Sequence, residues 1–169
     1  FVVDRLNGKI RKITPSGIVT TFAIDLGNPI ALSIDSNDNV FVGRSIPNSA
    51  SSNDILKITP GGSVSTFVGS SYGNINANGT NAQFKYVTSI DFDSNENLIV
   101  TDGGNSSIRK ITPQGEVTTI STSASGTNYA GPQGLKFNSS KNEIYIADNG
   151  NFRIVKLDYG AGTVSSTSV

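Results

Sequence analysis

Three stretches of this 169-residue chain restate one another, and this internal repeat constrains the fold more than any single residue does. Residues 28–67, 86–121 and 132–167 share one succession of short apolar segments, and the chain begins inside a fourth copy. The third segments of the copies end at equivalent apolar residues, which are Ile13, Ile58, Ile111 and Leu157. Their spacing of 45, 53 and 46 positions is typical of β-propeller blades, and no 3.6-residue apolar period of a helical repeat appears.

The third copy predicts the strands of one blade. Thr88–Phe92 alternates between polar and apolar residues, as an innermost strand does. Leu98–Val100 is apolar throughout, which indicates burial on both faces between neighbouring blades. A third strand over Ser107–Ile111 ends in a Thr-Pro-x-Gly turn, and Val117–Ile120 forms the outer strand.

We therefore expect an all-β fold, a β-propeller of four-stranded antiparallel blades. Its units would be a partial blade at residues 1–27, which lacks the innermost strand, and blades at 28–69, 70–122 and 123–169. All four units would belong to one domain, three full blades and one partial blade of an incomplete ring.

A corner motif recurs between the second and third strands. It reads Asp4-x-x-Asn7-x-x-Ile10-Arg11, Asp102-Gly-Gly-Asn105-x-x-Ile108-Arg109 and Asp148-Asn-Gly-Asn151-Phe-Arg153-Ile154. This motif resembles the signature of NHL-repeat β-propellers, and the linker at 78–84 resembles the loop that introduces a blade in bacterial secreted members. The resemblance covers essentially the whole chain and implies a parent ring of six blades. It implies no single function, because NHL propellers include RNA binders, interaction scaffolds and lyases.

We interpret the polar residues of these corners as structural. Side chains of Asp and Asn in turns hydrogen-bond nearby backbone, which favours this role over metal binding or catalysis for Asp4, Asn7, Asp102, Asn105, Asp148, Asn151 and Arg153. We expect the aliphatic stems of Arg109 and its counterpart Arg11 to lie in the seam between blades, with the charges at its edge. The second copy departs from the pattern, since it has Arg44 in place of Asp and an expanded segment over residues 45–54.

The composition excludes several chemistries. The chain has no Cys and no His, so it contains no thiolate nucleophile and no imidazole base. Its formal net charge is zero, which argues against nucleic-acid binding. No apolar run is long enough for a membrane-spanning helix, so we expect no membrane insertion. We also expect no metal and no cofactor. The polar, Cys-free composition suits an extracellular or periplasmic location.

Loops joining the second to the third strand and loops joining one blade to the next emerge on the same face of a propeller. That face receives the irregular sequence of this chain, and loops on a rigid scaffold commonly carry recognition. The candidate ligand-binding residues are Arg44, Asn48, Asn53, Tyr72, Asn74 and Tyr129. Amide and phenol groups suit a protein, peptide or glycan partner, and the alternative is that these loops are only solvated linkers. If the tyrosines bind a ligand, replacing Tyr72 and Tyr129 with Ala should weaken binding and leave the melting temperature nearly unchanged.

Our functional expectation is a non-catalytic binding or scaffold module of the NHL type. One alternative is a segment of a gluconolactonase-like hydrolase or a lyase whose catalytic residues lie in blades not present here. The chain is short for a closed ring, which would expose apolar blade faces. It would be a piece of a longer polypeptide, a protomer that closes a ring by self-association, or a structural subunit of an extracellular assembly.

Overall fold

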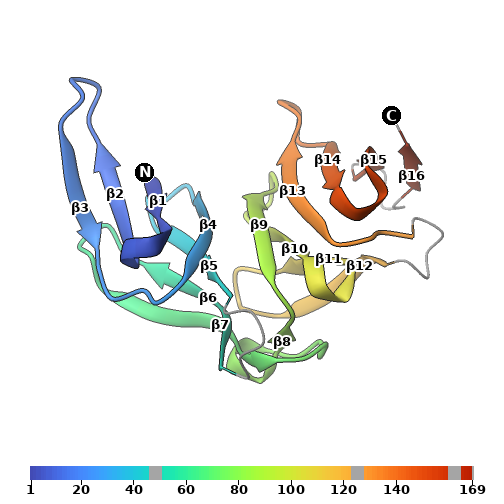
Figure 1. Ribbon diagram of the computed structural model, residues 1–169, viewed down its shortest axis with the longest axis horizontal. Helices are drawn as coiled ribbons and strands as arrows, with labels where there is room; N and C mark the ends of the chain where they lie inside the picture. Colours follow the sequence, from blue (N-terminus) through green and yellow to red (C-terminus); the bar gives the residue numbers. More distant parts are fainter. Residues whose placement is uncertain (46–50, 123–127, 160–164, 169) are drawn as a thin grey trace.

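The computed structural model describes residues 1–45, 51–122, 128–159 and 165–168. These residues form four sheets that follow one another along an arc in the order of the sequence (Figure 1). The sheet of β1–β3 lies at one end of the arc and the sheet of β13–β16 at the other. The expected propeller fold, with three full blades and one partial blade, is confirmed.

The strand and turn boundaries are as follows. Blade 1 contains β1 (Val2–Asp4), the 3-10 turn η1 (Arg5–Asn7), β2 (Lys9–Ile13) and β3 (Val19–Ala23). Blade 2 contains β4 (Pro29–Ile34), β5 (Val40–Arg44), β6 (Ser51–Ile58), β7 (Val64–Tyr72), the turn η2 (Gly79–Asn81) and β8 (Gln83–Phe84). Blade 3 contains β9 (Val87–Phe92), β10 (Leu98–Asp102), the turn η3 (Gly103–Asn105), β11 (Ser107–Ile111) and β12 (Val117–Thr122). Blade 4 contains β13 (Pro132–Phe137), β14 (Glu143–Asp148), the turn η5 (Asn149–Asn151), β15 (Arg153–Asp158) and β16 (Ser165–Ser168).

Blade 2 has a fifth strand that the repeat does not predict. β8 pairs in parallel with the end of β7, so residues 83–84 complete the sheet of blade 2. The expected boundary between residues 69 and 70 therefore falls inside β7. No helix among the described residues is long and apolar enough to cross a membrane.

The Thr-Pro-x-Gly turns have the predicted geometry. Gly17, Gly62 and Gly115 adopt positive φ angles of 82°, 86° and 86°, which glycine reaches without steric cost. The N–H of each glycine donates to the carbonyl of the threonine three residues earlier. These turns hold the third and outer strands of blades 1 to 3 in register.

The core lies in the seams between blades. Apolar residues of β2 and β3 pack against β5 and β6, those of β5 to β7 against β9 and β10, and those of β10 and β11 against β13 to β15. The second strands are buried on both sides, as their continuous apolar sequence predicts: Val40, Val42, Leu98, Ile99 and Val100 are at most 1% exposed. The innermost strand β9 contacts both β4 and β13, so the three innermost strands lie side by side around the centre of the arc.

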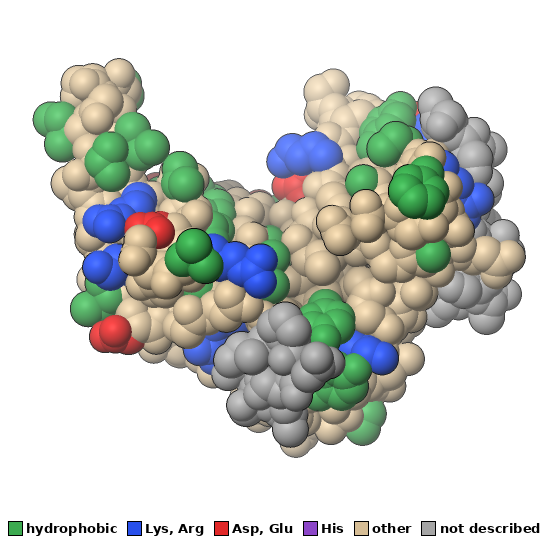
Figure 2. Space-filling model, viewed as in Figure 1, with side chains coloured by type: hydrophobic (Ala, Val, Ile, Leu, Met, Phe, Trp, Pro, Cys, Tyr) green, Lys and Arg blue, Asp and Glu red, His purple; other side chains and the backbone are tan. Residues whose placement is uncertain are grey.

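The two ends of the arc expose positions that the interior seams bury. Val2 is 47% exposed, whereas its equivalents Val42 and Val100 are fully buried. At the other end Tyr145 is 39% exposed, although its equivalent Ile99 is fully buried. Figure 2 shows an open notch between these two end sheets.

Candidate ligand-binding face

The corner of blade 3 contains a buried ion pair, which binds the linker that precedes this blade. Asp102 and Arg109 are both fully buried, and Nη1 of Arg109 lies 2.8 Å from Oδ2 of Asp102. The other carboxylate oxygen accepts the backbone N–H of Lys85 at 2.7 Å, and Asn105 donates to both Asp102 and the carbonyl of Gly73. Burial raises the pKa of Asp102 to about 6, against the lowering effect of these hydrogen bonds and of Arg109.

Arg109 also reaches the linker itself. Its guanidinium donates to the carbonyl of Ile75 at 3.1 Å and to Oδ1 of Asn76 at 2.7 Å. We expected this charge at the edge of the seam, and that expectation is wrong. The linker over residues 74–76 folds back and supplies the acceptors, which allows the charge to be buried.

Blade 4 repeats the arrangement with greater exposure. Asp148 accepts the N–H of Ala130 at 2.7 Å, the amide of Asn151 at 2.8 Å and Nε of Arg153 at 2.8 Å. Burial acts to raise the pKa of Asp148, but the hydrogen bonds from Asn151, Ala130 and Arg153 outweigh it and hold this pKa below its usual value. In blade 1, Asp4 binds Asn7 at 2.8 Å and Arg11 at 3.0 Å in the same way.

Blade 2 keeps the ion pair but exchanges the two charges. Arg44 occupies the position of Asp148 in the strand register, and Asp54 occupies that of Arg153. Two hydrogen bonds of 2.8 and 2.6 Å join the guanidinium and the carboxylate. The departure at Arg44 is therefore a reversal of the same contact.

Glycines allow the linkers to approach the corners closely. A Cβ on Gly104 would lie 2.4 Å from Cγ and 2.6 Å from the carbonyl oxygen of Lys85. A Cβ on Gly150 would lie 2.6 Å from the carbonyl oxygen of Ala130. Each corner thus binds the segment that enters the innermost strand of its own blade, which places that segment rigidly on one face.

A pocket of about 380 Å³ opens on this face, beside the innermost strands. It is formed by the first residues of β4, β9 and β13 and by the corners of blades 1 and 3. Its lining consists of Arg5, Ile30, Tyr86, Thr88, Gly103, Gly104, Gly131, Pro132 and Gln133. We call it the central pocket.

Two exposed polar side chains border the central pocket. Nε of Arg5 donates to Oδ1 of Asn28 at 2.9 Å, and its two terminal nitrogens donate to none of the described residues. The side-chain amide of Gln133 forms no hydrogen bond with another described residue. The hydroxyl of Thr88, in contrast, already donates to the carbonyl of Pro132 at 2.9 Å. Tyr86 adds a half-buried phenol ring. Arg5 is the single charged residue in this described lining.

Tyr72, one of the proposed binding residues, contacts Tyr86 of the pocket lining. It is 38% exposed, and its ring meets the ring of Tyr86 edge-on at 6.2 Å. The ammonium of Lys85 lies 5.2 Å above the Tyr72 ring, and a hydrogen bond with Tyr72 raises the pKa of Lys85. Tyr72 therefore belongs to the rim of the face.

Two other proposed binding residues are buried, which corrects our expectation for them. Tyr129 is 4% exposed, because its ring fills the apolar seam between blades 3 and 4. Asn53 is fully buried, and its Oδ1 accepts the backbone N–H of Tyr86 at 3.4 Å. Neither side chain can meet a ligand without unpacking.

The remaining proposed binding residues are separate from the pocket. Arg44 is half-buried in its contact with Asp54. Asn74 is exposed, yet its Oδ1 accepts a hydrogen bond from Arg109 at 3.3 Å. Asn48 lies outside the described residues.

Sequence reasoning missed Arg5, Tyr86 and Gln133. The candidate residues were placed in long irregular loops, whereas the pocket is lined by residues at the starts of the innermost strands and at the regular corners. The repeat pattern could have indicated these pocket residues, because Thr88 and Gln133 are both the second residue of an innermost strand. Their equivalent in blade 2, Ile30, also lines the pocket.

Comparison with solved structures defines the class of protein as a β-propeller. A gluconolactonase from Xanthomonas campestris matches with a TM-score of 0.76 and 12% identity over 98% of this chain and 56% of its own. An auxiliary nutrient binding protein from Bacteroides ovatus matches with a TM-score of 0.72 and 17% identity over 98% of this chain and 44% of its own. Virginiamycin B lyase from Staphylococcus aureus matches with a TM-score of 0.68 and 18% identity over 98% of this chain and 50% of its own. These likenesses show the fold alone, and the chain spans about half the length of these structures.

A family model matches within blade 4. Residues 129–157 match the model of the NHL repeat. This match supports the resemblance of the chain to NHL-repeat β-propellers. A search of curated proteins gives no significant match.

Proposed function

We propose that the chain is a non-catalytic recognition module whose central pocket binds a polar segment of a peptide or a glycan. The observation that supports this most is the convergence of all four blades on a pocket of about 380 Å³ bordered by exposed Arg5 and Gln133. Arginine donates well to carboxylates, and a primary amide both donates and accepts. The ring of Tyr86 offers flat apolar contact to a sugar or peptide segment.

The chemistry of the lining favours binding over catalysis. No carboxylate is among the described residues that line the pocket, and the chain has no His or Cys. A general acid or base of the usual kind is therefore not at hand. A single positive charge favours ligands that carry an acidic group, such as a uronic acid or an acidic peptide.

The test is a screen of purified chain against a panel of neutral and acidic oligosaccharides and a peptide library. For each ligand that binds, the affinities of the variants Arg5→Gln and Gln133→Ala are then compared with that of the wild type. We expect each substitution to weaken binding about tenfold or more, since a buried hydrogen bond to a ligand is lost. Gln114→Ala is the matched control, because Gln114 is an exposed glutamine on the turn between the third and outer strands. If a ligand binds both variants with the same affinity as the wild type, the central pocket is not its binding site.

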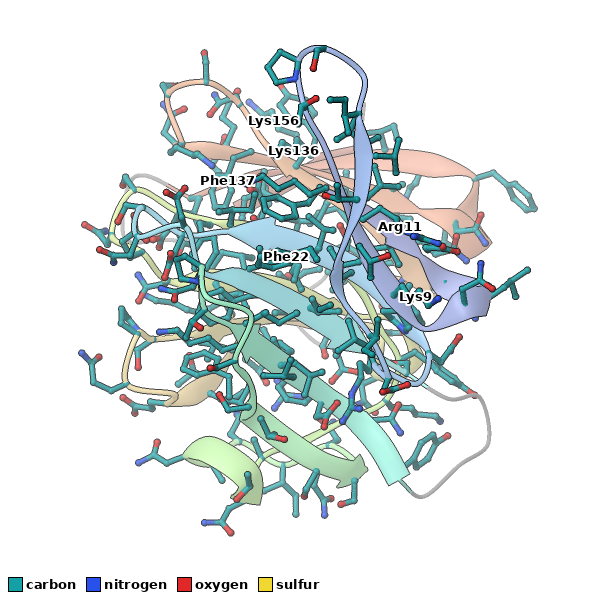
Figure 3. All side chains as sticks on the ribbon, turned by 90° about the vertical axis from the view of Figure 1, so that its left-hand side faces the viewer. Lys9, Arg11, Phe22, Lys136, Phe137 and Lys156 are labelled. Carbon is teal, nitrogen blue, oxygen red and sulfur yellow. The ribbon has the colours of Figure 1, made fainter. Side chains whose placement is uncertain are left out.

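The exposed end faces support a second proposal, that both are covered by further propeller blades. Lys136 and Lys156, labelled in Figure 3, belong to the sheet of blade 4, and Lys9 and Arg11 belong to β2. Figure 1 shows that these two sheets lie at opposite ends of the arc. Tyr145 lies between the two lysines in the strand register and on the same side of the sheet. Its counterparts Phe41 and Ile99 contact the next blade in interior seams.

Light scattering over a concentration series tests which blades cover these faces. A closed dimer or larger closed species indicates that a second copy supplies them. A monomer that aggregates indicates that blades of the same polypeptide do so. A monomer that stays monodisperse at high concentration would refute the need for a cover.

A further inference from the structure

A groove between blades 2 and 3 lies on the face opposite the central pocket. Its volume is about 330 Å³, and it is lined by Asp35, Asn37, Phe41, Lys57, Phe67, Phe92, Glu96, Leu98, Ile111, Thr112 and Pro113. These residues come from the turns and strand ends at which the first strand meets the second and the third meets the outer strand. We call it the blade 2–3 groove.

The neighbouring seam, between blades 3 and 4, shows what fills the equivalent position. There Tyr159 donates its hydroxyl hydrogen to Oδ2 of Asp93 at 2.8 Å. Its ring meets Phe137 edge-on, with the centroids 5.4 Å apart and the planes at 76°. Tyr159 thus occupies the seam with its ring on a phenylalanine and its hydroxyl on an aspartate.

Each partner of Tyr159 has a counterpart in the blade 2–3 groove. Asp35 and Asp93 each directly follow the innermost strand and accept two backbone N–H groups of the following turn. Phe92 corresponds to Phe137 as the last residue of its innermost strand. The position of Tyr159, two residues after the apolar residue Leu157, is held in blade 3 by Pro113, two residues after Ile111.

The exchange of a tyrosine for a proline leaves the groove without its ring. Phe41 meets Phe67 at 5.1 Å and Phe92 at 5.2 Å, both edge-on, and the ammonium of Lys57 lies 5.5 Å from the Phe41 ring. A cavity of about 150 Å³ lined by apolar side chains already accepts a benzene ring, so the groove is large enough for one.

Asp35 has the acceptor capacity that such a ring would need. Among the described residues, its Oδ2 accepts one hydrogen bond, from the amide of Asn39 at 2.7 Å. The equivalent atom of Asp93 accepts the amide of Asn97 and the hydroxyl of Tyr159 together. A carboxylate oxygen has two lone pairs, which makes both bonds compatible.

We propose that the blade 2–3 groove binds a phenol group from outside the chain. The ring packs edge-on against Phe92 and Phe67, and the hydroxyl donates to Asp35. The phenol is either a tyrosine side chain of a partner or a free phenolic compound, since both present the same chemistry. This site is independent of the central pocket.

The experiment titrates p-cresol and toluene into the purified chain and follows the ring resonances of Phe41, Phe67 and Phe92 by NMR. We expect p-cresol to shift them and to bind about tenfold more tightly than toluene, because it adds a hydrogen bond to a charged acceptor. Asp35→Asn should reduce the affinity for p-cresol to that for toluene. We expect asparagine to be tolerated at this position, since Asn138 occupies it in blade 4 and its Oδ1 also accepts two backbone N–H groups of the following turn, those of Asn142 and Glu143.

Pro113→Tyr provides a second variant, which places the phenol in the groove from within and should abolish the p-cresol response. Equal affinities for p-cresol and toluene, or no shift of the three phenylalanine rings, would overturn the proposal. N-acetyl-tyrosinamide distinguishes the source of the phenol. If it binds as p-cresol does, the site accepts a tyrosine within a chain, and if only p-cresol binds, the site accepts a free phenolic compound.

Discussion

Replacing Arg109 with leucine should destabilise the chain far more than the same replacement at the equivalent Arg11. Leucine is native at this repeat position in blade 2, where Leu56 stands. Arg109 is fully buried, and its loss would leave the buried carboxylate of Asp102 without its counter-charge and would remove one of the two hydrogen bonds to the carbonyl of Ile75. Breaking a buried ion pair by removing one partner costs about 3–5 kcal/mol. Arg109→Leu should therefore lower the urea midpoint by about 2 M.

Arg11→Leu is the matched control. In the pair of Arg11 with Asp4 the side chains are 32% and 24% exposed, and such pairs contribute about 0–1 kcal/mol. Equal losses of unfolding free energy in the two variants would refute the reasoning that burial sets the energy of this contact. If Arg109→Leu does not fold, Arg109→Lys replaces it as the test variant, because lysine keeps the charge but lacks the forked geometry of the guanidinium. Faster hydrogen exchange of the backbone amides in the linker of residues 74–76 would then show that the linker is held less tightly.

Three further predictions concern packing and pH. Tyr129→Ala should lower the unfolding free energy by about 3–5 kcal/mol, whereas Tyr72→Ala should change it by less than about 1 kcal/mol; comparable losses would contradict the assigned burial. Gly104→Ala should cost about 1–3 kcal/mol, because the new Cβ would meet Lys85 at 2.4 Å, while Gly61→Ala has its nearest neighbour at 4.0 Å and should be nearly neutral in the same urea titrations. The pKa of Asp102 is raised to about 6, so the folded chain keeps this proton longer than the unfolded chain and loses stability as the pH rises from about 4 to 6. The stability difference between wild type and Asp102→Asn should therefore narrow over this range, and a widening difference would mean that the ion pair with Arg109 dominates.

Local sequence was sufficient to predict the blades. Strand positions follow from the alternation in Thr88–Phe92 and the apolar run Leu98–Val100, because side-chain period and burial are properties of neighbouring residues. The turn glycines, such as Gly115, are equally local, since the backbone angle alone requires them. Repetition then extended these assignments along the chain.

The environment of each repeated position was decided only by the tertiary structure. Arg11 and Arg109 occupy the same motif position, yet Arg11 is partly exposed and Arg109 is fully buried, because the linker of residues 74–76 folds over the corner of blade 3. Tyr72 and Tyr129 look alike as loop tyrosines, but one is exposed at the rim and the other fills a seam. Burial depends on segments distant in sequence, and a repeat motif contains no information about which of its copies such a segment will cover.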